Sequence, residues 1–304
     1  MTNLATTVGS IRLRAAVLTA SGTAGHGAEF ARYMKPAELG AVVVKSMKAG
    51  EWVGNPSPRV HPTAAGMINS VGLQGKGVAH WLEHELPELI ATGADVVASI
   101  WGNSIDDYRA AAEALADAPE QVVAVEVNVS CPNLEDRSKM FAHSAESTRE
   151  AIEATVGCDR PRWAKLSPNA ADLPEIAVAA HEAGAEAVVL TNTLLGMVID
   201  TDTRRPVLGA KKGGLSGSAM HPVAVRAVYD VHEAAPDLPI VGVGGTASGT
   251  DVVEFLLAGA SAVEVGTATF ADPRAPRRIL KEFSKWCERR GVVDVAELIG
   301  AAHG

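Results

Sequence analysis

Short apolar runs alternate with amphipathic stretches along nearly the whole chain. The runs are rich in Val, Ile, Leu and Ala, and most are bounded by Gly, Pro, Asn or charged residues, which is typical of buried parallel strands. We predict eight strands from them: Ala15–Ala20, Ala41–Ser46, Asp95–Trp101, Val122–Val129, Arg162–Ser167, Ala187–Asn192, Pro239–Gly244 and Ala262–Gly266.

The stretches between these runs have the apolar spacing of helices. They predict helices at Val78–Ala91, Ile105–Ala116, Ala145–Val156, Pro174–Ala183, Pro222–Ala234 and Gly249–Ala258. Eight strands alternating with helices indicate the α/β class and a (β/α)₈ TIM barrel. A doubly wound open sheet is the alternative, and the strand number and chain length favour the barrel.

Two connections are longer than a simple strand-to-helix link, namely Lys48–Gly77 and Leu194–Ala219. Long connections at the C-terminal ends of barrel strands usually carry the functional site. We find no linker, repeat or low-complexity tract. We therefore expect a single domain over residues 1–304, with extended loops over the C-terminal face of the barrel.

Composition narrows the class of protein. The chain is 47% hydrophobic but only 4% aromatic, and its 29 glycines suit many tight turns. The net charge of −9 argues against a nucleic-acid partner, because no basic stripe is present. We expect no membrane span and no signal peptide. The three cysteines form no CxxC pair and their number is odd, so we expect a reducing, cytoplasmic setting.

The segment Asn128-Val129-Ser130-Cys131-Pro132-Asn133 is the strongest chemical signal. It places a thiol between two carboxamides at the end of a strand, which Pro132 terminates. A thiol can accept a proton once it ionises, so Cys131 is the candidate base. The alternative is a buried structural cysteine. For Cys158 and Cys287 we expect a structural or a surface position.

Two lysines, Lys45 and Lys165, stand at the ends of apolar strands. A buried ammonium needs an anion or an acceptor, so both could stabilise negative charge on a reduced flavin or a substrate carboxylate. The alternative is a side chain that extends to water.

Carboxamides and glycines complete the predicted site. Asn69, Asn128, Asn133 and Asn192 could surround a ring with alternating N–H and C=O groups, such as a pyrimidine. Glycine-rich turns at 213–217, 242–246 and 265–268 suit a phosphate. The nine histidines show no HxH or HExxH spacing, so we expect no metal site. Surface or loop positions are expected for His61, His80, His84 and His143.

These motifs resemble one family over nearly the whole chain, the class 1 dihydroorotate dehydrogenases of pyrimidine synthesis. Cys131 occupies the place of their cysteine base, whereas class 2 enzymes have serine there. Gly72-Leu73-Gln74 and the segment 192–197 look like subclass 1B. The other matching segments are 19–23, 44–46, 66–74, 128–133, 165–169, 191–200, 213–217, 242–245 and 264–267.

The resemblance implies an FMN enzyme that oxidises dihydroorotate to orotate. Cys131 would take the C5 proton while hydride passes from C6 to flavin N5. The residues implied to hold FMN are Ser21, Lys45, Ser46, Ser99, Asn128, Lys165, Thr191, Gly217, Gly244, Gly245, Gly266 and Thr267. Those implied to hold substrate are Lys45, Asn69, Ser70, Val71, Gly72, Leu73, Asn128, Asn133, Asn192 and Thr193.

Subclass 1B also implies a separate subunit with FAD and an iron–sulfur cluster that passes electrons to NAD⁺. Three cysteines cannot supply a four-cysteine cluster, which agrees with such a partner. A homodimer or a 2+2 heterotetramer is compatible with the family.

Three positions depart from the family pattern: Ser99 where Asn is more frequent, His61 where an acid is common, and Lys139-Met140-Phe141 in the expected lid over substrate. The alternatives are an enzyme for another dihydropyrimidine, a fumarate-using enzyme of class 1A type, and a non-catalytic phosphate-binding scaffold.

Overall fold

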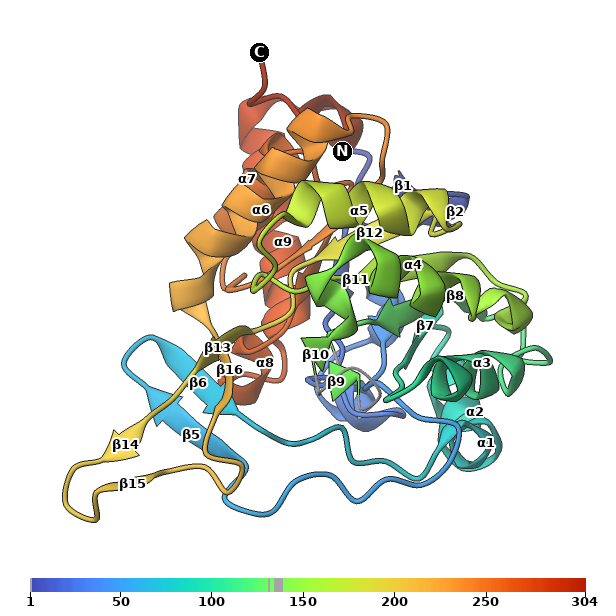
Figure 1. Ribbon diagram of the computed structural model, residues 1–304. Helices are drawn as coiled ribbons and strands as arrows, with labels where there is room; N and C mark the ends of the chain where they lie inside the picture. Colours follow the sequence, from blue (N-terminus) through green and yellow to red (C-terminus); the bar gives the residue numbers. More distant parts are fainter. Residues whose placement is uncertain (1, 131, 134–138) are drawn as a thin grey trace.

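The computed structural model describes residues 2–130, 132–133 and 139–304, although the side chains of 132, 133, 139 and 140 are not described. Its centre is a parallel sheet with the strand order β3-β18-β17-β12-β11-β8-β7-β4 (Figure 1). This order confirms the predicted (β/α)₈ barrel and all eight predicted strands. Their bounds are β3 (Val17–Thr19), β4 (Val42–Val43), β7 (Val96–Ile100), β8 (Val122–Asn128), β11 (Arg162–Lys165), β12 (Ala187–Leu190), β17 (Ile240–Val243) and β18 (Ala262–Val265).

A buried threonine helps to close the ring where β3 meets β4. The backbone N–H of Gly40 donates to Val17 O at 2.8 Å. The Thr19 hydroxyl accepts from the N–H of Val43 at 2.9 Å and donates to the carbonyl of the same residue at 3.2 Å. One side chain therefore satisfies backbone groups that a regular strand pair would satisfy.

Thr19→Val is expected to lower the free energy of unfolding by about 1–3 kcal/mol, because it leaves a buried N–H and a buried carbonyl without this partner. Thr7→Val, on the exposed face of β1 (Thr6–Val8), is the matched control and should have little effect. Denaturant unfolding of both variants measures the difference. Equal stability of the two would contradict the role of Thr19.

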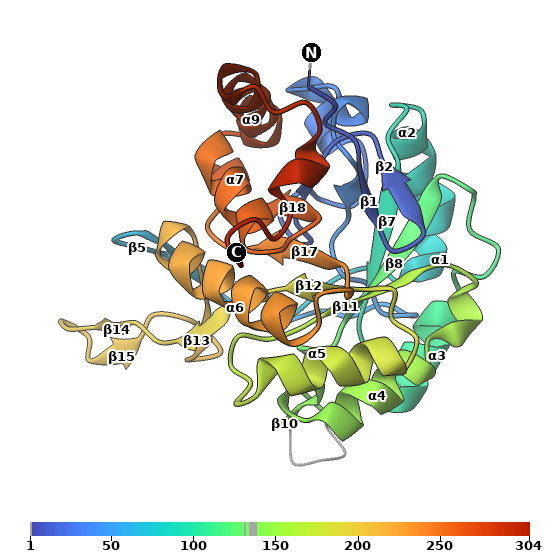
Figure 2. The same ribbon diagram turned by 90° about the horizontal axis from the view of Figure 1, so that it is seen from above.

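Helices surround the barrel (Figure 2). They confirm the predicted ones, except that the first is interrupted by a π-helical turn at Trp81–Glu85. Helix α9 was not predicted, although Ile279, Phe283 and Cys287 form a buried stripe along it. The bounds are α1 (Val78–His80), α2 (Leu86–Ile90), α3 (Ile105–Glu113), α4 (Ala145–Glu153), α5 (Leu173–Glu182), α6 (His221–Ala234), α7 (Gly249–Leu257), α8 (Ala268–Ala271) and α9 (Ala275–Arg290). No described helix combines the length and apolar character needed to cross a membrane.

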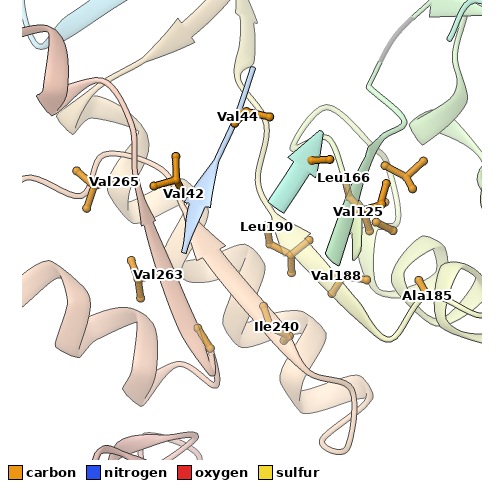
Figure 3. Packing of buried hydrophobic residues seen from close by; sticks show 14 of the residues in the cluster. Val42, Val44, Val125, Leu166, Ala185, Val188, Leu190, Ile240, Val263 and Val265 are labelled. Atoms are coloured by element: carbon orange, nitrogen blue, oxygen red, sulfur yellow. The ribbon is translucent and has the colours of Figure 1, made fainter. Parts of the chain in front are cut away.

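The core has two layers because strand side chains alternate in direction. The outer layer joins strands to helices, and Figure 3 shows part of it, including Val188, Ile240 and Val263. The inner layer fills the barrel with residues such as Leu18 and Trp163. The β1–β2 hairpin, with β2 at Ile11–Leu13, adds Val8 and Leu13 to this inner layer.

The two long connections meet in one antiparallel sheet of order β13-β16-β6-β5 (Figure 1). The first supplies β5 (Val60–Thr63) and β6 (Gly66–Asn69), and the second supplies β13 (Leu194–Gly196) and β16 (Gly213–Ser216). Smaller hairpins are β14 (Ile199–Asp200) with β15 (Arg205–Pro206), and β9 (Pro132–Asn133) with β10 (Lys139–Met140). The long connections were predicted, but their pairing was not.

Candidate active site

A cavity of about 480 Å³ opens at the C-terminal ends of the barrel strands, under the antiparallel sheet. Residues singled out from the sequence make up much of its wall. Those that line it are Ser21, Lys45, Ser46, Asn69, Val71, Gly72, Leu73, Asn128, Lys165, Thr191, Asn192, Thr193, Gly217, Gly244, Gly245, Gly266 and Thr267.

Two predicted residues, Ser70 and Ser99, are buried and do not line the cavity. Ser99 lies inside the barrel, where its hydroxyl is 2.8 Å from that of Ser46 and donates to Glu126 Oε1 at 2.8 Å. Ser99 therefore does not lie where it could contact a ligand in the cavity. Ser99 instead supports Ser46, which does line the cavity.

The candidate base, Cys131, lies outside the described residues, and so does the side chain of Asn133. The preceding residue, Ser130, lines the cavity, and its backbone N–H donates to Asn128 Oδ1 at 3.2 Å. Phe141 was expected in a lid, but it is fully buried and packs edge-on against Tyr108, with ring centroids 5.3 Å apart. The chain on both sides of the undescribed segment is thus anchored at the barrel.

Lys165 forms the polar floor of the cavity. Its ammonium donates to Glu126 Oε2 at 3.1 Å and to Glu264 Oε2 at 2.9 Å. Burial lowers the pKa of Lys165, but the two carboxyl groups outweigh burial and raise the pKa above its usual range. The side chain therefore stays positively charged, although it is almost completely buried.

Lys45 approaches the cavity from the end of β4, and its ammonium donates to the carbonyl of Gln74 at 2.6 Å. Burial lowers the pKa of Lys45, and the nearby Arg59 guanidinium lowers it further. A second cation close by means that an anion bound here would be attracted by both groups.

Three carboxamides face the cavity from different elements. Asn128 ends β8, where its Nδ2 donates to Ser46 Oγ at 3.3 Å and its Oδ1 accepts from Asn192 Nδ2 at 3.2 Å. Asn69, at the end of β6, donates to the carbonyl of Gly214 at 3.3 Å. Donors and acceptors thus converge on one space from the barrel and from the sheet above it, an arrangement that suits a planar polar ring.

Glycines form the opposite wall. Gly217 and Gly245 have φ angles of +101° and +72°, which favour glycine. A Cβ at Gly217 would lie 2.5 Å from Gly66 Cα, and one at Gly245 would lie 2.7 Å from the backbone nitrogen of His221. The Thr191 hydroxyl beside this wall is buried and has no hydrogen-bond partner among the described residues. Glycine lets a ligand approach the backbone closely, so this wall and the unused hydroxyl suit a ring compound that carries a phosphate.

Sequence reasoning missed two groups of site residues. Glu126 and Glu264 lie within apolar strands. A charged residue in an apolar run is the signal that identified the lysines, and it could have identified these glutamates as well. The apolar part of the cavity wall had no comparable signal, because its residues come mostly from the long connections and helix starts. It includes Val60, Met67, Leu215, Met220, Val243 and Phe270.

Outside the cavity, Cys158 and Cys287 are buried, as expected for structural residues. Burial raises the pKa of both thiols, that of Cys287 to about 11. Of the four histidines expected at the surface or in loops, His84 and His143 are exposed, whereas His61 and His80 are half-buried.

One cluster, His221, Asp251 and Glu254, has the composition of a metal site. Its groups already have partners, however. His221 Nε2 lies 2.6 Å from Glu254 Oε2, and Asp251 Oδ2 accepts two backbone N–H groups at the start of α7. We therefore assign no metal to it.

Comparisons with known proteins agree with this site. The family model described as dihydroorotate dehydrogenase matches residues 3–286. The chain is 43% identical to the "Dihydroorotate dehydrogenase B (NAD(+)), catalytic subunit" of Geobacter metallireducens over 98% of both chains. Proteins of the same description from Desulforamulus reducens and Bacteroides thetaiotaomicron are 43% and 39% identical, each over 99% of both chains.

Proposed function

This chain belongs to the dihydroorotate dehydrogenase family, and we propose that it oxidises (S)-dihydroorotate to orotate with FMN in pyrimidine biosynthesis. The observation that carries the proposal is the cavity at the barrel's C-terminal face, where two lysines, three carboxamides and a glycine wall converge. We treat residues 1–304 as one FMN-binding barrel domain.

The site residues divide into two proposed sets. The glycine wall with Thr191, Thr267, Ser21 and Ser46 would hold the phosphate and ring of FMN, and Lys165 would lie against the ring. Lys45 and the three described carboxamides would hold the substrate, and the cation of Lys45 suits its carboxylate. Asn133, Val71, Gly72, Leu73 and Thr193 complete the proposed substrate set, while Ser70 and Ser99 would act only through their neighbours.

When bound, FMN supplies an acceptor for the hydride that leaves C6 of the substrate. We propose that the Cys131 thiolate removes the C5 proton, since its segment follows directly on Ser130 at the cavity wall. Lys165 keeps a fixed positive charge at the cavity floor, where it stabilises negative charge that develops on a ring above it. The carboxamides orient the substrate and exchange no proton.

For the electron acceptor we propose NAD⁺, reached through a separate subunit that carries FAD and an iron–sulfur cluster. The relatives' description as a catalytic subunit supports a partner. We propose a cytoplasmic homodimer core, alone or as part of a 2+2 heterotetramer.

The protein reconstituted with FMN should be yellow and should bleach when dihydroorotate is added without oxygen. Dihydrouracil, which lacks the carboxylate, should bleach it much more slowly. Equal or faster bleaching by dihydrouracil would favour a different dihydropyrimidine substrate, and failure to bind flavin would favour a scaffold. Reoxidation by fumarate alone, without an iron–sulfur flavoprotein, would favour a class 1A type of enzyme.

Gly245→Ala is expected to weaken FMN binding by about 5- to 150-fold, because a Cβ at this left-handed position must displace the turn at a cost of about 1–3 kcal/mol. Riboflavin, which lacks the phosphate, should bind the variant and the parent almost equally. Gly50→Ala is the control, since its Cβ would meet no atom within 4 Å. Fluorescence titration measures the affinity of the parent and of both variants for FMN and for riboflavin. Unchanged FMN affinity in Gly245→Ala would argue against a phosphate at this wall.

A further inference from the structure

Two glutamates share one lysine inside the barrel, and this composition leaves their charges unbalanced. Glu126 and Glu264 have side-chain exposures of 0%, and that of Lys165 is 7%. If both carboxyl groups were ionised, the three would carry a net charge of −1. An uncompensated charge in a buried site is strongly unfavourable, so a neutral cluster is expected.

No second cation among the described residues acts on Glu264, and Lys45 in the cavity wall donates to the carbonyl of Gln74 instead. The other described side chains of the barrel interior near the cluster are apolar, such as Leu18, Val97, Val189 and Val241, apart from Ser99 and the polar residues of the cavity wall. The titratable groups that act on Glu264 are Lys165 and Glu126. The charge must therefore be balanced within the cluster, which requires one proton.

The two carboxyl groups differ in their partners. Both oxygens of Glu126 are used, since Ser99 donates to Oε1 at 2.8 Å and Lys165 donates to Oε2 at 3.1 Å. Glu264 Oε1 is buried and has no partner among the described residues. Both carboxyl groups accept from the same ammonium, at 3.1 and 2.9 Å, so they lie beside each other. Each disfavours the ionisation of the other, which favours a proton on one of them.

Burial raises the pKa of Glu264 to about 8, against the opposing effect of Lys165 and with a further increase from Glu126. The geometry and the charge balance thus agree that Glu264 is the protonated member at neutral pH.

We propose that Glu126 and Glu264 share one proton behind Lys165. This pair is a positioning site, and it exchanges its proton with water when the charge of the ring bound in front of Lys165 changes. The second part rests on the proposed function. A more negative ring attracts the Lys165 ammonium and weakens its hold on the carboxyl groups, so the pair retains its proton to a higher pH. The proton moves between water and a carboxylate oxygen, and these groups exchange no electrons.

Infrared spectroscopy of the FMN-loaded and the flavin-free protein tests the shared proton. We expect the carbonyl stretch of a protonated carboxyl group in the parent protein at pH 6, and its loss as the pH rises through about 8. Glu264→Gln and Glu126→Gln should both lack the band, because in each the remaining carboxylate pairs with Lys165. Glu186→Gln is the control and should keep the band, because the Glu186 carboxylate accepts from the exposed Ser10 and lies outside the cluster. A missing band in the parent, or one that survives in either cluster variant, would overturn the proposal.

The midpoint potential of bound FMN, measured against pH, tests the coupling to the ring. Above pH 8 the potential of the parent should fall more steeply with pH than that of Glu264→Gln. Parallel curves would overturn the coupling. If the protein binds no FMN, the proposed function fails, while the infrared band of the flavin-free protein still decides whether the proton is shared.

Discussion

Replacing Cys131 with alanine is expected to slow the bleaching of bound FMN by dihydroorotate about 10²- to 10⁴-fold, the usual contribution of a general base. The C5 proton would then leave without a positioned acceptor, while the carboxamides and Lys45 would still hold the ring. Orotate should therefore bind Cys131→Ala with nearly the affinity of the parent. Stopped-flow absorbance measures the bleaching rate, and titration of the flavin spectrum measures orotate binding.

Cys131→Ser separates the base from the shape of the side chain. The parent rate should rise with pH as the thiol ionises, and the serine variant should lack that rise, because a hydroxyl does not ionise in this range. Cys158→Ala is the control, since Cys158 is buried and its pKa is raised by burial. Bleaching of Cys131→Ala at the parent rate would contradict the assignment of the base.

The barrel could be predicted because each strand has its own local signal. A run such as Val122–Asn128 is mostly apolar, is buried on both faces and is followed by a helical pattern, and this combination has few alternatives to a parallel sheet. The lysines were equally visible, because a charge at the end of an apolar run stands out. The antiparallel sheet had no such signal: β6 and β16 are short, and Asn69 bonds Gly214 across 145 residues.

The Glu126–Lys165–Glu264 cluster shows the same limit at the site. Each member is visible as a charged residue in an apolar strand. Their pairing spans 39 and 99 residues and depends on which strands are neighbours and which side chains face inward. Only closure of the barrel brings the three together, so the role of the glutamates could not be read from their local sequence.

Replacing Lys165 with methionine is expected to lower the free energy of unfolding by about 3–5 kcal/mol at neutral pH, because it leaves a buried carboxylate without its cation. Methionine fills a similar volume, so the loss reports charge more than packing. Denaturant unfolding of the flavin-free protein measures it without a contribution from cofactor binding.

Lys165→Met combined with Glu126→Gln should recover most of this loss, since Glu264 can then remain a neutral acid.

The difference in unfolding free energy between the parent and Lys165→Met, its stability deficit, should also depend on pH. The folded pKa of Glu264 is already raised by burial, and removing Lys165 takes away the group that opposes this. The folded parent releases this proton near pH 8, whereas the folded variant keeps it to a higher pH, so the deficit should grow as the pH rises above about 8. A second substitution that deepens the loss, or a deficit that does not change with pH, would show that Lys165 acts here through packing and not through its charge.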